Sequence, residues 1–436
     1  MTTTVMTATA RRGALVVLLA GQLMTSMDSS LISVALPAIR EGFGAGGATV
    51  QLIASGYALT LGVLIVTGAR LGDVLGQRRA FLIGLAVFTT MSALCAVAPT
   101  AGVLVAIRTA QAAAAALMMP QVFALIQLEF DGQARRRAIG LYSMTIGLAA
   151  TLGQLAGGLV VSAVGWRAVF LINVPIGVGT LLAGWRALPE TRRRAARLDP
   201  VGVALLTGGM LGVIAPLLLG REYGWRPWTW VVLGAGLALL AVFAGHERRA
   251  SAPLLEFRAV RRAWAGLAAC FVLAGSYAAL LFALTLHLQG ERGMDPLQAG
   301  LAFLPFTVAF GAMSLIGPRL TWRQLPSAGI ALFALSVAGI AVLLPLGQRW
   351  LWVLLVLAGI GHGAGYAPLM ARLTRVVGAE GASALAALNS TGPMLASATA
   401  VALLGGFYLE WGLTTALTGI AAALAAGIWL GAERQR

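Results

Sequence analysis

Two ionisable side chains of opposite sign lie well inside long apolar segments of this sequence. Asp28 falls in the first such segment, within MDSSLISVALP (residues 27–37), and Arg108 falls in the fourth. At the ~1.5 Å rise per residue of an α-helix, Asp28 lies about 12 Å and Arg108 about 10 Å from the same predicted membrane face. A charged side chain in hydrocarbon costs at least ~2.5–3.5 kcal/mol. We therefore expect the two side chains to lie near one another and to face a shared polar cavity.

Two interpretations of this pair remain open. In the first, it is a static bridge that fixes helix packing. In the second, Asp28 binds and releases a proton under the control of Arg108 and cavity water, because a nearby opposite charge favours the carboxylate and burial favours the neutral acid. Acidic groups inside a membrane usually have a function, so we favour the second interpretation.

Other polar side chains inside the apolar segments are candidates for the wall of a substrate cavity. Gln111 is one helical turn from Arg108 and is expected to orient it, whereas interhelical hydrogen bonding is an equally good reason for Tyr57 or Asn389. For His362, in a glycine-rich stretch, titration and simple packing are equally acceptable. The predicted cavity residues are Ser29, Ser30, Ser33, Tyr57, Gln111, Gln154, His362 and Asn389. No pattern in the sequence is typical of a metal site, a catalytic nucleophile or a phosphate-binding loop, so we expect neither enzyme activity nor a cofactor.

The composition indicates that these residues lie in a membrane protein. Hydrophobic residues make up 59% of the 436 residues and charged residues 11%, whereas a soluble domain carries about 25% charged residues. A membrane-spanning helix needs about 20 apolar residues. We predict an all-α polytopic membrane protein with fourteen transmembrane helices, at 13–36, 49–70, 80–99, 101–127, 138–163, 168–188, 200–220, 228–246, 263–288, 297–317, 327–346, 350–371, 383–408 and 413–432.

The arginines orient these spans. The net charge is +16, and most of the arginines fall in alternate short loops, as the positive-inside rule requires of cytoplasmic loops. This pattern predicts that both termini are cytoplasmic, in the cell membrane, and it accounts for the basic charge without a nucleic-acid partner.

A weak internal repeat predicts the domain organisation. GARL (68–71) at the end of the second span is similar to GPRL (317–320) at the end of the tenth. We predict two pseudo-symmetric six-helix bundles, at 1–190 and 263–436, with two inserted helices and linkers at 191–262 between them, an arrangement typical of transporters. A small-residue seam on the fifth span should permit close helix packing, and its members are Gly140, Ala149, Gly153, Gly157 and Gly158.

Five segments resemble motifs of the major facilitator superfamily, in particular its fourteen-span drug:proton antiporter branch (QacA/EmrB-like). MDSSLISVALP resembles D-x-T-x-x-N-x-A-L-P, LGDVLGQRR (71–79) is similar to G-x-x-x-D-[RK]-x-G-[RK]-[RK], and RTAQA (108–112) resembles R-x-x-Q-G. Residues 140–158 are similar to the antiporter motif G-x8-G-x3-G-P-x-x-G-G, and WRAVFLINVP (166–175) to W-R-x-x-F-x-x-N-x-P.

This resemblance implies roles for particular residues. Asp73, Gly76, Arg78 and Arg79 would form a cytoplasmic gate loop that latches the two halves, and Arg108 would take part in proton transfer. The resulting expectation is a proton-coupled secondary active exporter of amphipathic small molecules by alternating access, monomeric, with the proton gradient as its energy source. A metabolite:proton symporter or uniporter is the alternative, and a non-transporting membrane scaffold or sensor is a more remote one. The single deep carboxylate, already accompanied by an arginine, favours neutral, weakly basic or anionic substrates.

Overall fold

The computed structural model describes residues 8–45, 47–191, 199–220, 224–250, 257–294, 296–320, 322–344, 349–378 and 382–432, and every regular element in them is helical. The N-terminal helices are α1 (Ala8–Phe43), α2 (Gly47–Leu75), α3 (Gln77–Ala96), α4 (Ala101–Glu129), α5 (Gly132–Val164), α6 (Trp166–Leu171) and α7 (Asn173–Ala187). They are followed by α8 (Pro200–Leu219) and α9 (Pro227–Glu247). The C-terminal helices are α10 (Phe257–Leu286), α11 (Pro296–Ala302), α12 (Leu304–Ile316), α13 (Leu325–Leu343), α14 (Arg349–Val377) and α15 (Ala382–Ala432). A π-helical turn, η1 (His287–Glu291), follows α10, and a 3-10 turn, η2 (Gly317–Arg319), follows α12.

Eleven helices in the described part of the chain are long and apolar enough to cross a membrane. They coincide with eleven of the fourteen predicted spans. The other three predicted spans, 138–163, 297–317 and 383–408, are helical but do not belong to the eleven. Within the described residues of α5, the apolar stretch is Leu155–Val164. The second of these spans is divided between α11 and α12 at Phe303, and the third is the first arm of α15, which bends at Gly412 (φ 83°).

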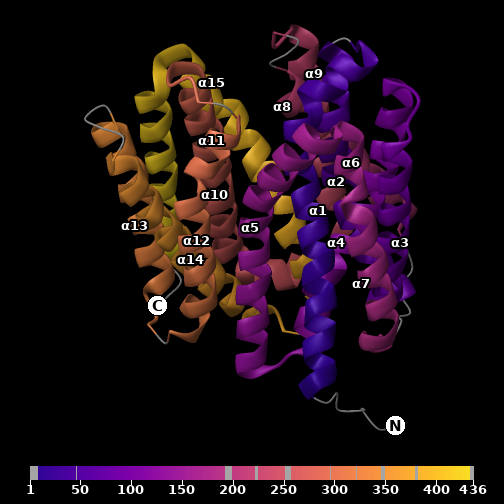
Figure 1. Cartoon of the computed structure of the whole chain (residues 1–436). Helices are drawn as coiled ribbons and strands as arrows, with labels where there is room; N and C mark the ends of the chain where they lie inside the picture. The colour runs from indigo at the N-terminus through magenta and orange to yellow at the C-terminus, as the bar shows by residue number, and fades with distance from the viewer. Residues whose placement is uncertain are drawn as a thin grey trace.

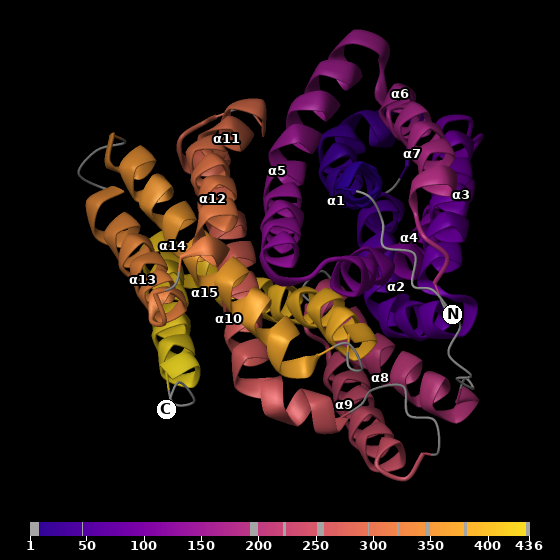
Figure 2. The same cartoon turned by 90° about the horizontal axis from the view of Figure 1, so that it is seen from below.

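The helices pack as two groups with a helix pair beside them (Figure 1). Helices α1–α7, here called the N-terminal group, contact one another, and so do helices α10–α15, the C-terminal group. Helix α8 packs against α2 and α15, α9 packs against α8, and Figure 2 shows this pair along one side of both groups. The two groups meet where α5 lies against α12 and where α2 lies against α15.

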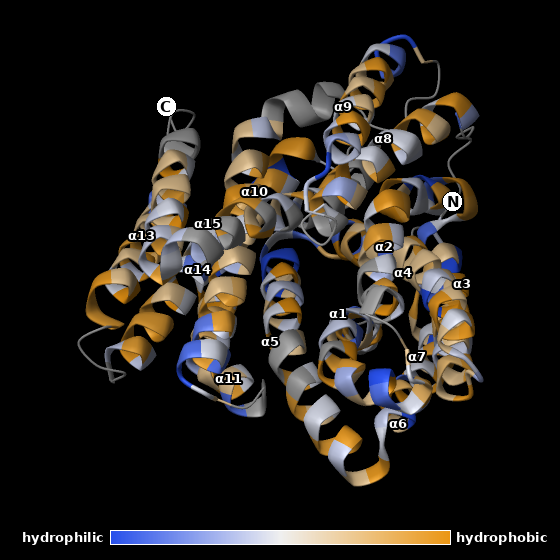
Figure 3. Cartoon of the chain, turned by 90° about the horizontal axis from the view of Figure 1, so that it is seen from above, coloured by the Kyte–Doolittle hydropathy of each residue, from blue (hydrophilic) through white to orange (hydrophobic). Residues whose placement is uncertain are grey.

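Most of the outward-facing surface is apolar. Figure 3 shows hydrophobic residues along the length of most helices, with hydrophilic residues fewer and often near helix ends. Large side chains such as Leu159, Val164, Val231 and Leu335 are at least 66% exposed. Exposed apolar side chains in such numbers would favour aggregation in water, whereas they match the hydrocarbon core of a bilayer.

The predicted small-residue seam on α5 faces two different neighbours. A Cβ atom at Gly153 would lie 2.7 Å from the backbone oxygen of Met27, and one at Gly157 would lie 3.3 Å from that of Leu31, so both glycines let α5 approach α1. A Cβ atom at Gly140 would instead lie 2.5 Å from the backbone oxygen of Ser314 on α12. Ala149 is fully buried among residues of α1, and Gly158 is half-buried. One helix thus packs closely both inside its own group and across to the other group.

Candidate functional site

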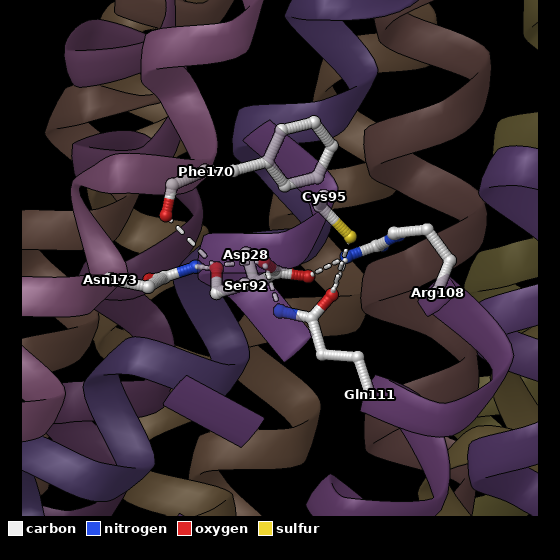
Figure 4. A network of polar contacts seen from close by, with 7 residues as sticks. All are labelled: Asp28, Ser92, Cys95, Arg108, Gln111, Phe170 and Asn173. Carbon is white, nitrogen blue, oxygen red and sulfur yellow. Dashed lines mark hydrogen bonds and ion pairs between the residues drawn. The ribbon is translucent and has the colours of Figure 1, made fainter. Parts of the chain in front are cut away.

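An ion pair buried inside the N-terminal group joins α1 to α4 (Figure 4). The guanidinium Nη1 of Arg108 donates to Oδ2 of Asp28, and each residue is 1% exposed. The same nitrogen also donates to Oε1 of Gln111 at 2.8 Å, and Nε2 of Gln111 donates to Oδ1 of Asp28 at 3.4 Å. The two charges that the sequence puts at similar depth are thus in contact, and Gln111, one turn from Arg108, touches both.

The second side of Asp28 is held by α7. Nδ2 of Asn173 donates to Oδ1 of Asp28 at 2.9 Å and to Oγ of Ser92, on α3, at 3.1 Å. Ser92 in turn donates to the backbone oxygen of Phe170 at 2.9 Å, and both polar side chains are fully buried. The Sγ atom of Cys95 lies 3.9 Å from Oε1 of Gln111. Helices α4 and α7 therefore donate hydrogen bonds to the carboxylate on α1, and α3 contacts their side chains through Ser92 and Cys95.

The helical hydrogen bonding is interrupted at Ile172, next to Asn173, while the backbone there stays in the α region (φ −56°, ψ −40°). Helix α6 ends at Leu171 and α7 begins at Asn173. Pro175 lacks a backbone N–H and its ring clashes with the carbonyl four residues earlier, which is that of Leu171, so a continuous helix is disfavoured at this point. The asparagine stands at the start of the new helix, beside the middle of α1.

The arginine also contacts an aromatic ring. Cζ of Arg108 lies 4.3 Å from the ring centroid of Tyr57 on α2, and Tyr57 is 2% exposed. A cation over an aromatic face is attracted by the ring quadrupole, by ~2 kcal/mol or more when desolvated. The guanidinium therefore has a carboxylate, an amide oxygen and an aromatic face as neighbours.

This set of partners can support a change in the protonation of Asp28. In the ionised state the carboxylate accepts hydrogen bonds from Arg108, Gln111 and Asn173. When Asp28 gains a proton its attraction for Arg108 falls, but Arg108 retains the oxygen of Gln111 as an acceptor. Since a buried polar group without a partner costs ~1–3 kcal/mol, that alternative acceptor limits the cost of separating the pair.

The remaining predicted cavity residues lie in several places. Ser29 is exposed and Ser30 is half-buried on α1, while the side chains of Ser33 and Gln154 are outside the described residues. His362 and Asn389 belong to the C-terminal group, on α14 and α15. The ring contacts of His362 and the hydrogen bond of Asn389 are with residues of that group. The structure thus brings Tyr57 and Gln111 to the Asp28–Arg108 pair, and puts His362 and Asn389 in a separate cluster.

That separate cluster is aromatic. The imidazole of His362 stacks on Phe333 with ring centroids 5.2 Å apart, and its Nδ1 has no hydrogen-bond partner among the described residues. Tyr366 donates from its hydroxyl to Oδ1 of Asn389 at 2.9 Å. The rings within 4.9 to 6.1 Å of the imidazole are those of Tyr277, Phe306, Phe310, Phe333 and Tyr366. The surroundings of His362 are those of a packed apolar core.

The predicted gate loop joins α2 to α3 along the chain and contacts the end of α7. Asp73 is 2% exposed and accepts hydrogen bonds from Gln77 at 3.1 Å and from Arg70 at 3.4 Å. Gly76 has a φ of 90°, which favours glycine, and Arg79 is exposed.

Arg78 makes the contacts that hold this loop. Its guanidinium donates to a carboxylate oxygen of Glu190 and to the backbone oxygen of Trp185, and its backbone N–H donates to the hydroxyl of Thr191. All three partners follow or end α7, so these contacts lie at the N-terminal group rather than between the two groups.

Two residues of the site were not predicted from the sequence. Asn173 stands inside the motif-like segment 166–175, but nothing in that segment connects it to Asp28. Ser92 is a lone hydroxyl in an apolar helix, a common feature of membrane helices. A signal was present in both cases, as a polar residue inside a span, but the partner of each could be found only from the packing of the helices.

Comparison with known proteins identifies the family. A family model described as Major Facilitator Superfamily matches residues 18–401. The probable actinorhodin transporter of Streptomyces coelicolor is 37% identical over 376 residues, which cover 81% of this chain and 64% of that protein. The alignment thus spans less than two thirds of that relative. The puromycin resistance protein pur8 of Streptomyces alboniger is 36% identical over 408 residues, covering 89% of this chain and 80% of that protein.

The fold is similar to that of a solved transporter structure. The crystal structure of the human organic anion transporter MFSD10 (TETRAN) superposes with a TM-score of 0.71 at 15% sequence identity, covering 96% of this chain and 99% of that one. With a family model matched over most of its length and relatives as similar as these, the chain belongs to the Major Facilitator Superfamily, as a multi-pass membrane transporter.

Proposed function

We propose that this protein is a proton-coupled exporter of amphipathic small molecules, and that Asp28 is the group that binds the proton. The observation that carries the proposal is the environment of Asp28: a carboxylate 1% exposed, paired with Arg108 and hydrogen-bonded to two other helices, α4 and α7. A charge at that depth is costly, so its presence indicates a role in packing or in transport. Here Arg108 already donates to Gln111 as well as to Asp28, so it keeps one acceptor when Asp28 is neutral.

The coupling follows from the contacts of Asp28. In its ionised state it holds α1 to α4 and α7 through Arg108 and Asn173. A proton that reaches Asp28 from the outer side neutralises its charge and weakens those contacts. Helix α1 then moves relative to its neighbours, and the N-terminal and C-terminal groups change their position relative to each other. Release of the proton on the inner side restores the ion pair. Each cycle then couples the entry of protons to the export of substrate.

The finer architecture is part of the same proposal. We propose fourteen membrane crossings: the eleven candidate spans, α5, the α11–α12 pair, and the first arm of α15. Residues 1–190 and 263–436 would be the two moving halves, 191–262 would carry the two inserted helices, and the protein would work as a monomer. The predominance of arginines in alternate loops supports cytoplasmic termini.

The substrate would be a secondary metabolite or an antibiotic. Support comes from relatives whose names refer to actinorhodin transport and puromycin resistance. We propose neutral, weakly basic or anionic compounds, bound between the two groups. A largely apolar lining with few polar groups suits a range of amphipathic molecules.

Efflux from cells tests this function. A panel of amphipathic antibiotics and dyes is loaded into cells with and without the protein, and retention is measured before and after a protonophore dissipates the proton gradient. The proposal requires faster loss of at least one compound with the protein, and no such difference after the protonophore. Efflux that persists without a gradient would contradict proton coupling. In inside-out vesicles, addition of substrate should alkalinise the lumen for an exporter, whereas a symporter acidifies it.

A further inference from the structure

Four arginines line one small cavity at an end of the molecule where the two groups meet. The cavity has a volume of about 270 Å³, and its lining includes Arg136 on α5, Arg319 in η2, and Arg372 and Arg375 at the end of α14. Pro318, Leu320, Pro368 and Ala371 complete it. We call it the arginine pocket. Its helices end on the side seen from below in Figure 2.

These arginines differ from four others in the described chain, which are paired with carboxylates. Arg70, Arg78, Arg108 and Arg135 each form an ion pair with a carboxylate. For the arginine pocket, no ion pair with a carboxylate is found within the described ranges of the chain. Arg372 donates to the backbone oxygen of Trp322 at 3.2 Å, and Arg375 to that of Ala371 at 3.4 Å. These bonds satisfy some of the donors but leave the charges uncompensated.

The charges would repel one another without an anion. Two unit charges a few ångströms apart near a protein surface interact by a few kcal/mol, and here four of the same sign surround one cavity. Positive loop residues also serve membrane topology, but topology requires only that they lie on one side. It does not require them to converge on a shared cavity from three separate elements.

We propose that the arginine pocket binds a phosphate-bearing anion. A guanidinium group can donate two parallel hydrogen bonds to the oxygens of a phosphate. Arg136 and Arg372 are half-buried, so solvent screens their charges less than those of the exposed Arg319 and Arg375. The anion has two possible sources: the headgroup of an anionic lipid in the adjacent leaflet, or a free phosphate compound in solution. This inference depends on the pocket and not on the transported substrate.

Binding would affect the arrangement of the two groups. Arg136 belongs to the N-terminal group and the other three arginines to the C-terminal group, and α5 contacts both η2 and α14 at this place. An anion held by both sides stabilises the arrangement in which they are close, and any ligand that prefers one arrangement increases its population. The anion would therefore slow the separation of α5 from α14 at this end.

The test uses the purified full chain with inorganic phosphate in detergent. Thermal unfolding is measured against phosphate concentration, with sodium chloride at matched ionic strength as the reference. The variants are Arg319→Gln, Arg372→Gln and the charge-conserving Arg319→Lys, with Arg249→Gln, an exposed arginine after α9, as the control of equal charge change. Wild type, Arg249→Gln and Arg319→Lys should be stabilised by phosphate beyond the chloride reference. Each Gln variant should bind at least about tenfold more weakly, because it loses a charge-assisted bond.

A second arm separates the two sources. The same proteins are reconstituted in vesicles of phosphatidylcholine with or without phosphatidylglycerol, and stability and lipid retention are compared. Stabilisation by phosphatidylglycerol alone assigns the pocket to a lipid headgroup, and stabilisation by inorganic phosphate, with or without the lipid effect, assigns it to a soluble anion. If neither probe stabilises wild type, or if the Gln variants respond as Arg249→Gln does, the pocket does not bind phosphate and the proposal is overturned.

Discussion

Removal of either partner of the Asp28–Arg108 ion pair should destabilise the protein strongly, and removal of both should cost much less than the sum. Breaking a buried pair at one end costs ~3–5 kcal/mol, because the other charge stays buried without its partner. In Arg108→Ala the carboxylate retains only the amides of Gln111 and Asn173. In Asp28→Asn the guanidinium retains Gln111 at 2.8 Å and the ring of Tyr57. We therefore expect this variant to lose about 3 kcal/mol of stability, the lower limit of that range.

The double variant Asp28→Asn/Arg108→Ala isolates the interaction between the two residues. Residues in direct contact show coupling energies up to ~3 kcal/mol, and for this fully buried pair we expect about 2–3 kcal/mol. The assay is equilibrium unfolding by dodecyl sulfate in mixed micelles, followed by circular dichroism, for wild type, both single variants and the double variant.

The chain offers a matched control for this cycle. Arg135 and Asp131 form an ion pair at 2.9 Å, but Asp131 is 80% exposed, and such surface pairs are worth ~0.3–0.5 kcal/mol. The same cycle with Asp131→Asn and Arg135→Ala should therefore give a coupling energy below about 0.5 kcal/mol. The reasoning is refuted if the buried pair gives a coupling energy as small as that of the exposed pair, or if either single variant costs less than about 1 kcal/mol.

Two further predictions concern helix packing and pH. Gly153→Ala should lower the free energy of unfolding by ~1–3 kcal/mol, because its Cβ would lie 2.7 Å from the α1 backbone. The control is Gly179→Ala on α7, where nothing lies within 4 Å, and this variant should be neutral or slightly stabilising. Equal effects of the two substitutions in the same unfolding assay would contradict the close α1–α5 contact. Asp199, at the N-terminus of α8, accepts hydrogen bonds from the backbone N–H of Gly202 and from His246, which hold its pKa below the ordinary value against the opposing effect of desolvation. Its contribution to the free energy of unfolding is therefore complete above its ordinary pKa and is lost as the pH falls through the lower folded-state pKa. Thermal unfolding should thus find Asp199→Asn less stable than wild type at pH 7, by a difference that disappears in strong acid, and a difference that does not change with pH would show that the hydrogen bonds of Asp199 contribute nothing.

The contact between Asp28 and Arg108 could be anticipated because charge in hydrocarbon is so costly. Only a few positions inside apolar segments carry charge, and depth along a helix follows from counting residues. The identity of the third partner could not be anticipated in that way. Asn173 reaches Asp28 because α7 packs against α1 and α3, and which helices pack together does not follow from the order of the residues.

The predicted cavity residues divide for the same reason. Tyr57 and Gln111 lie beside the ion pair, but His362 lies among five aromatic rings of the C-terminal group. A histidine in an apolar segment has the same sequence signature whether it faces water or packed rings. The number of spans shows a related difficulty: residues 297–317 are one apolar segment in the sequence, but they form two helices, α11 and α12, which meet at Phe303.

The proton-binding role of Asp28 is tested most directly in reconstituted vesicles. Wild type and Asp28→Asn are compared in two assays with a substrate identified by efflux: accumulation driven by an imposed pH gradient, and exchange of labelled for unlabelled substrate without a gradient. We expect Asp28→Asn to lose gradient-driven accumulation and to retain exchange, because the neutral amide, like the protonated acid, allows α1 to move but cannot bind and release a proton. Gradient-driven accumulation by Asp28→Asn at the wild-type level would contradict this expectation.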